Sequence, residues 1–175
     1  MKKVQAGTFR PERGNYPVRG HTMNLRIPHG LPALLLLLLP FPALASLGGD
    51  VTTVQADQAK MQGSLRSTSN NSYTLHEIQT PTGVAVKEYV SASGKVFAVT
   101  WQGPVHPDLR QLLGTYFDQF VQAEQAQRAQ RRGRGPVQIQ EPGLVVQISG
   151  HMKAFLGKAY VPQMLPAGVR AEDIL

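Results

Sequence analysis

The sequence predicts an α+β domain in which one main amphipathic helix packs on an antiparallel β-sheet, with a short helix at the N-terminal end. Two observations predict this class. Short runs of alternating apolar and polar residues, joined by Gly-containing turns, fill residues 73–101 and return after residue 137. Between them, residues 107–121 repeat apolar side chains at steps of three and four. The expected order is helix, three strands, helix, and two or three later strands.

The first part of this order is a short helix followed by a loop. Residues 51–61 place Val54 and Met61 near one face, which favours an amphipathic helix that ends at Gly63. Residues 64–72 are rich in Ser, Thr and Asn and are expected to form a loop.

Three strands of a meander are expected next, at residues 73–80, 84–90 and 96–101. Phe97, Val99 and Trp101 alternate with smaller residues in the third strand, so we expect them to share one face. Glu77 and Lys87 are possible cross-strand partners, which would be ordinary stabilisation of a sheet.

The main helix is expected to begin at Pro107 and Asp108, because proline suits the first helical position and a carboxylate suits the first turn. An Arg/Gln-rich stretch at residues 124–136 follows and is expected to be flexible. The later strand candidates are residues 137–140, 144–149 and 154–161.

Residues 1–45 have the organisation of an export signal. Arg26 precedes an apolar run at residues 33–41, and Ala43 and Ala45 form a small-residue cleavage site. The run is far shorter than the ~20 residues that span a bilayer, so no permanent membrane span is expected after cleavage. We expect a periplasmic or secreted protein cut after Ala45, with Met23 as the true start, and a single small domain at residues 46–175.

Removal of the signal changes the charge of the chain. The formal net charge of +7 falls to +2, since residues 46–175 hold 12 Lys and Arg against 10 Asp and Glu. The remaining basic character is concentrated in Arg128, Arg131, Arg132 and Arg134, which gives no general case for nucleic-acid binding. Cysteine is absent, which excludes disulfides, thiol nucleophiles and thiolate metal ligands.

A segment around the third strand carries a family resemblance. It runs from Glu88-Tyr89-Val90 through Trp101-Gln102-Gly103-Pro104 to Pro107-Asp108-Leu109-Arg110-Gln111-Leu112-Leu113-Gly114, together with the lead Leu47-Gly48-Gly49-Asp50. The chain resembles an uncharacterised family of exported proteobacterial proteins catalogued as domain of unknown function 2844. The resemblance implies export and a small single domain, and it implies no catalytic residue.

No catalytic, metal-binding or phosphate-binding motif is present in the sequence. There is no HExxH pattern, no G-x-S-x-G elbow and no glycine-rich phosphate loop. No cofactor is therefore expected. If the protein is an enzyme whose site assembles only in the fold, His106, Asp108 and Glu88 are the residues to consider, although His106 and Asp108 also suit a helix cap.

Two candidate interaction surfaces remain open at this stage. Trp101, with Phe97, Tyr89 and Tyr73, forms an exposed aromatic patch, or, as the alternation favours, Phe97, Val99 and Trp101 form the buried face beneath the main helix. The arginines at 128–134 form either a polyanion- or membrane-binding site or a solvated linker.

The function most consistent with these observations is a periplasmic accessory or binding domain without catalytic activity. Its partner would be an unknown periplasmic protein or ligand and not a nucleic acid. The alternatives are a small exported enzyme and a protein that attaches to polyanions or membrane surfaces through Arg128 to Arg134.

Overall fold

A computed structural model describes residues 47–130 and 135–174, which fall within one compact unit of the chain. The expected export segment, the cut after Ala45 and the start at Met23 lie outside the described residues. So do Arg131, Arg132 and Arg134.

The described residues form three α-helices, seven strands and three short 3₁₀ turns. The helices are α1 (Thr52–Met61), α2 (Leu109–Leu113) and α3 (Phe117–Gln130), and the turns are η1 (Gly114–Tyr116), η2 (Pro162–Met164) and η3 (Ala171–Asp173). The strands are β1 (Ser64–Ser69), β2 (Tyr73–Gln79), β3 (Ala85–Ser91), β4 (Val96–Gly103), β5 (Val137–Glu141), β6 (Leu144–His151) and β7 (Ala154–Tyr160).

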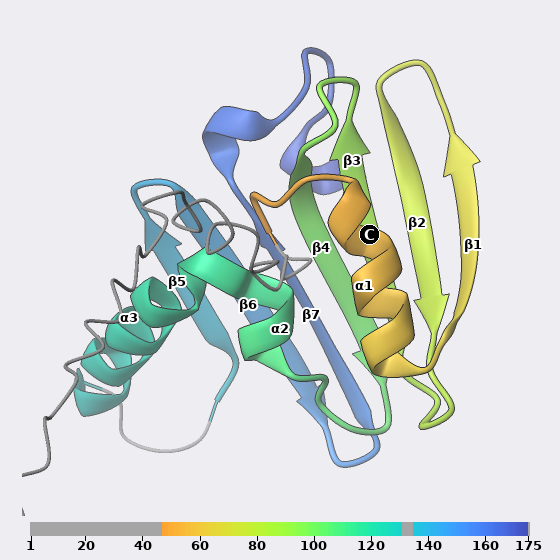
Figure 1. The fold of residues 1–175 in the computed structure, drawn as a ribbon. Helices are drawn as coiled ribbons and strands as arrows, with labels where there is room; N and C mark the ends of the chain where they lie inside the picture. Colours follow the sequence, from red (N-terminus) through yellow and green to blue (C-terminus); the bar gives the residue numbers. More distant parts are fainter. Residues whose placement is uncertain (1–46, 131–134, 175) are drawn as a thin grey trace, which may run out of the picture. The chain divides into compact units, whose positions relative to one another are not determined.

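The strands of the described residues form one antiparallel sheet in the order β1-β2-β3-β4-β7-β6-β5 (Figure 1). Strands β1 to β4 pair in sequence order, and β4 then pairs with β7, the last strand of the chain. The expected α+β class, with an antiparallel sheet and a main helical segment at residues 109–130, is confirmed.

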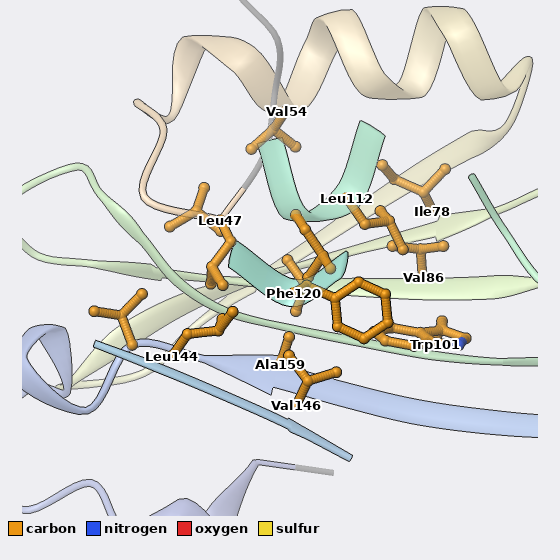
Figure 2. Close-up of a cluster of buried hydrophobic side chains, with 14 of the residues drawn as sticks. Leu47, Val54, Ile78, Val86, Trp101, Leu112, Phe120, Leu144, Val146 and Ala159 are labelled. Atoms are coloured by element: carbon orange, nitrogen blue, oxygen red, sulfur yellow. The ribbon is translucent and has the colours of Figure 1, made fainter. Parts of the chain in front are cut away.

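One face of the sheet, the helix-covered face, carries the larger apolar core. Val54 of α1, Leu112 of α2 and Phe120 of α3 pack there against buried side chains of the strands (Figure 2). The strand side chains of this cluster include Ile78, Val86, Val99, Trp101, Val146 and Ala159. Each large side chain buried in this way contributes about 1.5–3 kcal/mol before ordering entropy, so this cluster holds the helices on the sheet.

The other face, the second face, carries a smaller core covered by the C-terminal segment. Tyr89, Phe97 and Ala98 are buried there with Ile174. Residues 162–174, here called the tail, supply Met164, Leu165, Val169 and Ile174 to this cluster. The tail therefore covers part of the second face with the chain's own residues.

The prediction that Phe97 shares a face with Val99 and Trp101 is wrong. In the β3–β4 pairing Tyr89 is opposite Ala98, whereas its neighbour Val90 is opposite Val96, so Phe97 is the extra residue of a β-bulge. The bulge turns Phe97 to the second face, where its ring lies 6.1 Å from that of Tyr89. Val99 and Trp101 stay on the helix-covered face.

The loop expected at residues 64–72 is also wrong for most of its length, because Ser64–Ser69 forms β1. This strand is at the edge of the sheet and only Leu65 packs on the core, so polar residues are tolerated along it. The turn that follows is built by Asn70, whose side-chain oxygen accepts hydrogen bonds from the backbone N–H groups of Ser72 and Tyr73, both at 2.8 Å.

The main helical segment is interrupted at Gly114. This residue has a φ of +50°, which glycine adopts without a steric penalty, and it ends α2 after Leu113. A 3₁₀ turn then leads into α3, so the continuous apolar face expected from the spacing is carried by two helices.

Candidate functional site

The open part of the second face holds a cavity, here called the groove, of about 540 Å³. A row of polar side chains crosses the sheet along it, one from each of six neighbouring strands. In sheet order these are Glu77, Lys87, Thr100, Lys158, Gln147 and Gln138, and each is the register partner of the next. All six line the groove. We call them the polar row.

The sequence explains why this part of the face stays open. On five of these six strands, the residue two positions along from the polar row is apolar and on the same face, and the tail packs against most of this apolar row. The apolar row consists of Leu75, Tyr89, Ala98, Tyr160 and Val145. Tyr73 and Tyr89 at the tail-covered end contact one another with ring centroids 5.4 Å apart. The tail therefore packs on the apolar row, and the polar row borders the surface that the tail leaves uncovered.

Charge in the groove is dominated by two lysines on either side of Thr100. Lys87 precedes Thr100 in the row and has Glu77 as its other register partner, as the sequence allowed. Lys158 follows Thr100 and donates a hydrogen bond from Nζ to the backbone oxygen of Ala171 in the tail, at 3.1 Å. The groove therefore offers ammonium, hydroxyl and amide groups that bind polar ligand atoms, beside the apolar side chain of Leu156, which is 50% exposed.

A second cluster of polar residues lies on the helix-covered face, between the helices and the sheet. Glu88 of β3 is fully buried at 0% exposure and Asp57 of α1 is 2% exposed. Gln111 of α2 donates a side-chain hydrogen bond to Asp57 Oδ1, whereas Asp57 Oδ2 and both carboxyl oxygens of Glu88 are buried without a hydrogen-bond partner among the described residues. Asp57 and Glu88 influence one another's titration, and two neighbouring buried carboxylates that were both ionised would repel one another, so the pair favours holding a proton.

Burial decides which carboxyl holds that proton. Loss of hydration, and to a smaller extent the neighbouring Asp57 carboxyl, together raise the pKa of Glu88 from its ordinary value of 4.5 to about 9. Burial also raises the pKa of Asp57, to about 6, although the neighbouring Glu88 and the hydrogen bond from Gln111 oppose this rise. At pH 7 Glu88 is therefore protonated beside an ionised Asp57.

His76 is the register partner of Glu88 on β2 and lies at the edge of this cluster. Its Nδ1 is 2.7 Å from Ser67 Oγ, and burial lowers the pKa of its ring, which favours the neutral form. His76 therefore does not supply a positive charge that would stabilise an ionised Glu88.

The three residues considered for an enzyme do not form one site. His106 is exposed and its ring packs against Phe155, with centroids 4.0 Å apart. Asp108 caps α2, where Oδ1 accepts the backbone N–H groups of Arg110 at 2.9 Å and Gln111 at 3.3 Å. Glu88 is instead fully buried near Asp57 of α1, away from solvent.

The structure bears differently on the two candidate interaction surfaces, the aromatic patch around Trp101 and the arginine cluster. Trp101 is 2% exposed and belongs to the core of the helix-covered face, so it is not part of an exposed patch. Arg128 lies in the last turn of α3 and forms an ion pair with Glu124, with Nη2 and Oε1 2.7 Å apart. The rest of the arginine cluster lies outside the described residues.

Sequence reasoning missed Asp57, Lys87 and Lys158 as residues of interest. Asp57 follows the buried Val54 by three positions on α1, and this helical spacing places it on the inward face. The alternation of β3 and β4 likewise places Lys87 and Thr100 on one face. Nothing local shows that Lys158 lies beside Thr100, because β7 comes more than 50 residues later in the chain.

Among residues 47–130 and 135–174, no three His, Cys, Asp or Glu side chains are grouped as a metal site. No helix in the same residues has the length and apolar character needed to cross a membrane. No curated protein and no solved structure matches the chain. A family model does match residues 43–174, which is most of the chain. The chain therefore belongs to the family described as protein of unknown function (DUF2844).

Proposed function

We propose that the protein is an exported binding domain that holds its ligand in the groove. The observation that carries this proposal is the cavity of about 540 Å³ bordered by the polar row. Small-molecule and peptide sites in proteins are concave, occupy about 300–1,000 Å³, and combine apolar lining with a few placed polar groups. The groove has this composition.

The alternative of an enzyme built on Glu88 is less well supported. A general acid or base must come within hydrogen-bonding reach of its substrate, but Glu88 and Asp57 are covered by α1 and α2. Their arrangement supports a structural role. The groove side chains, by contrast, border uncovered surface and are suited to orienting a bound molecule.

Export rests on the order of charged residue, apolar run and small-residue site within residues 1–45. Full-length protein expressed in a bacterial host would be recovered from the periplasm, and its N-terminus sequenced. We expect Ser46 as the first residue. Recovery from the cytoplasm with an intact N-terminus would contradict export.

Binding is tested on the same periplasmic preparation by native mass spectrometry, which detects molecules that remain bound. Ser149→Trp places an indole in the groove, whereas Met152→Trp places one on a hairpin residue that is 83% exposed. We expect a bound mass in the wild-type protein and in Met152→Trp, and its loss in Ser149→Trp. Folded proteins that show no bound mass, or one unaffected by Ser149→Trp, would contradict the proposal.

A further inference from the structure

The tail shows how the second face of the sheet holds polypeptide. Its Ile174 is 0% exposed and packs with Tyr89, Phe97 and Ala98. Its backbone is held by Lys158, whose ammonium donates to the carbonyl of Ala171. The face therefore binds a polypeptide segment in two ways: aliphatic side chains enter the apolar row, and a lysine binds a backbone oxygen.

The tail reaches the edge of the groove, since Ile174 is one of the residues that line it. Beyond that edge the surface offers the same kinds of chemical group, apolar and hydrogen-bonding, with more charged side chains. Ala85 and Leu156 provide apolar contacts next to the polar row, and Thr100 and the glutamines provide hydrogen-bonding groups. A second segment of polypeptide would meet the same kinds of group as the tail does.

The charge of the polar row indicates which charge a bound segment should carry. The polar row has two cationic residues, Lys87 and Lys158, and one anionic residue, Glu77. Arg66 of β1 is the register partner of Glu77 and continues the row to the edge of the sheet with another positive charge. The row with Arg66 thus has an excess of two positive charges.

The groove is poorly suited to bases or sugar rings, which bind by stacking on aromatic faces. The one aromatic residue that borders it, Trp101, lies on the helix-covered side, with Gly157 between its ring and the groove. This leaves carboxylates and backbone carbonyls as the groups that the lysines and amides match best.

We propose that the groove binds an extended acidic segment of a partner polypeptide, which lies beside the tail. This inference rests on the proposed binding function and adds the chemical class of the ligand. The segment's carboxylates contact Lys87 and Lys158, its backbone contacts the hydroxyl and amide groups, and its small apolar residues contact Leu156.

The test uses the mature protein and three fluorescein-labelled ten-residue peptides, (Glu-Ala)₅, (Gln-Ala)₅ and (Lys-Ala)₅, with binding followed by anisotropy. We expect (Glu-Ala)₅ to bind at least about tenfold more tightly than the other two. We also expect its affinity to fall as salt is raised, because exposed charges are screened. Equal affinity for (Gln-Ala)₅ would overturn the proposal.

Lys87→Gln is the informative variant, since Lys87 lies within the polar row and the change removes its charge while keeping a hydrogen-bonding side chain. Its matched control is Lys60→Gln, which removes an exposed lysine from α1 on the other side of the sheet. We expect Lys87→Gln to weaken (Glu-Ala)₅ binding about tenfold and Lys60→Gln to leave it within twofold. Equal effects of the two changes would overturn the proposal.

Two further outcomes separate this inference from the proposed function. Loss of the co-purifying mass in Ser149→Trp, with no affinity for (Glu-Ala)₅, would leave a binding domain whose ligand is not an acidic peptide. Tighter binding of dextran sulfate than of (Glu-Ala)₅ at equal charge would likewise overturn the peptide in favour of a polysaccharide.

Discussion

The two halves of the sheet are built alike, but their cores differ in chemistry. In the first half α1 is followed by β1 to β4, and in the second α2 and α3 are followed by β5 to β7 (Figure 1). The halves meet where β4 pairs with β7. The second-half helices bury Leu112, Leu113 and Phe120 with one neutral polar residue, Gln111, whereas α1 buries Val54 with Thr53 and the ionisable Asp57.

This difference shows that helices can be held on the same sheet by two kinds of interface. An apolar interface gains its stability from area removed from water and is insensitive to pH. The interface under α1 instead includes Asp57 and Glu88, and burying a charge is costly unless it is neutralised or paired. A proton held on Glu88 neutralises one of the two carboxyls, so we expect the stability of the first half to depend on pH more than that of the second.

The largest loss of stability expected from a single substitution is that of a core side chain from the second half. Leu112→Ala removes a fully buried side chain and should lower the free energy of unfolding by about 2–5 kcal/mol. Urea denaturation would measure it, and the loss should be equal at pH 5 and pH 8. Leu156→Ala, at a half-exposed position, is the control and should cost less than about 1 kcal/mol. A strongly pH-dependent loss for Leu112→Ala would break the comparison.

The next effect is the pH dependence of stability. From pH 4.5 to about 9, the folded protein keeps a proton on Glu88 that the unfolded chain releases. The stabilising contribution is therefore complete below pH 4.5 and is lost as the pH rises through this window, by up to about 1.4 kcal/mol per pH unit. The raised pKa of Asp57 adds to the loss between pH 3.8 and about 6.

Glu88→Gln removes this titration while keeping a neutral polar side chain of the same size beside Asp57. We expect the variant to be more stable than the wild type at pH 9 and similar to it at pH 4, measured by urea denaturation across the range. Glu124→Gln, which removes an α3 carboxylate paired with Arg128, should leave the wild-type pH profile unchanged. A wild-type protein equally stable at pH 5 and pH 9 would refute a proton held on Glu88.

A smaller effect is expected at Gln111, which joins the halves because it belongs to α2 and donates to Asp57 of α1. Gln111→Leu leaves an ionised Asp57 without this donor and should cost about 1–3 kcal/mol at pH 8. At pH 4, where Asp57 is protonated, the cost should be smaller. In an Asp57→Asn background the pH dependence of this cost should vanish, and its persistence there would contradict the assignment.

The smallest effect is expected at Asp108, which caps α2 at the start of the second half. Asp108→Ala should lower stability by about 0.5–2 kcal/mol, because two backbone N–H groups lose their acceptor. Asp108→Ser keeps an acceptor and should recover most of the loss in a thermal melt. No recovery in Asp108→Ser would show that the cap is not the source.

Local patterns in the sequence predicted much of this fold. The alternation at residues 84–90 corresponds to β3, and the apolar spacing after Asp108 corresponds to the helical segment. Such patterns arise because each element has one face turned toward a core. They fail for β1, whose position at the edge removes the need for a buried face, and its Ser and Thr residues look like a loop.

The candidate sites were harder to predict because they depend on contacts between distant segments. Glu88 was a candidate, but its partner Asp57 lies on another element, and nothing in the spacing of either residue shows that they meet. The polar row requires the register of β4 against β7. The bulge that turns Phe97 to the second face is set by the same kind of long-range pairing.

Trp101 is the single tryptophan of the chain, so the intrinsic fluorescence of the protein reports on the surroundings of this one residue. A Cβ at Gly157 would lie 2.2 Å from Cζ2 of the indole, so the ring lies directly on the backbone at the floor of the groove. A ligand in the groove would change the polarity and rigidity of the surroundings of the Trp101 indole, which borders the groove. Intrinsic emission of the unlabelled protein can therefore be used to screen for occupants of the groove.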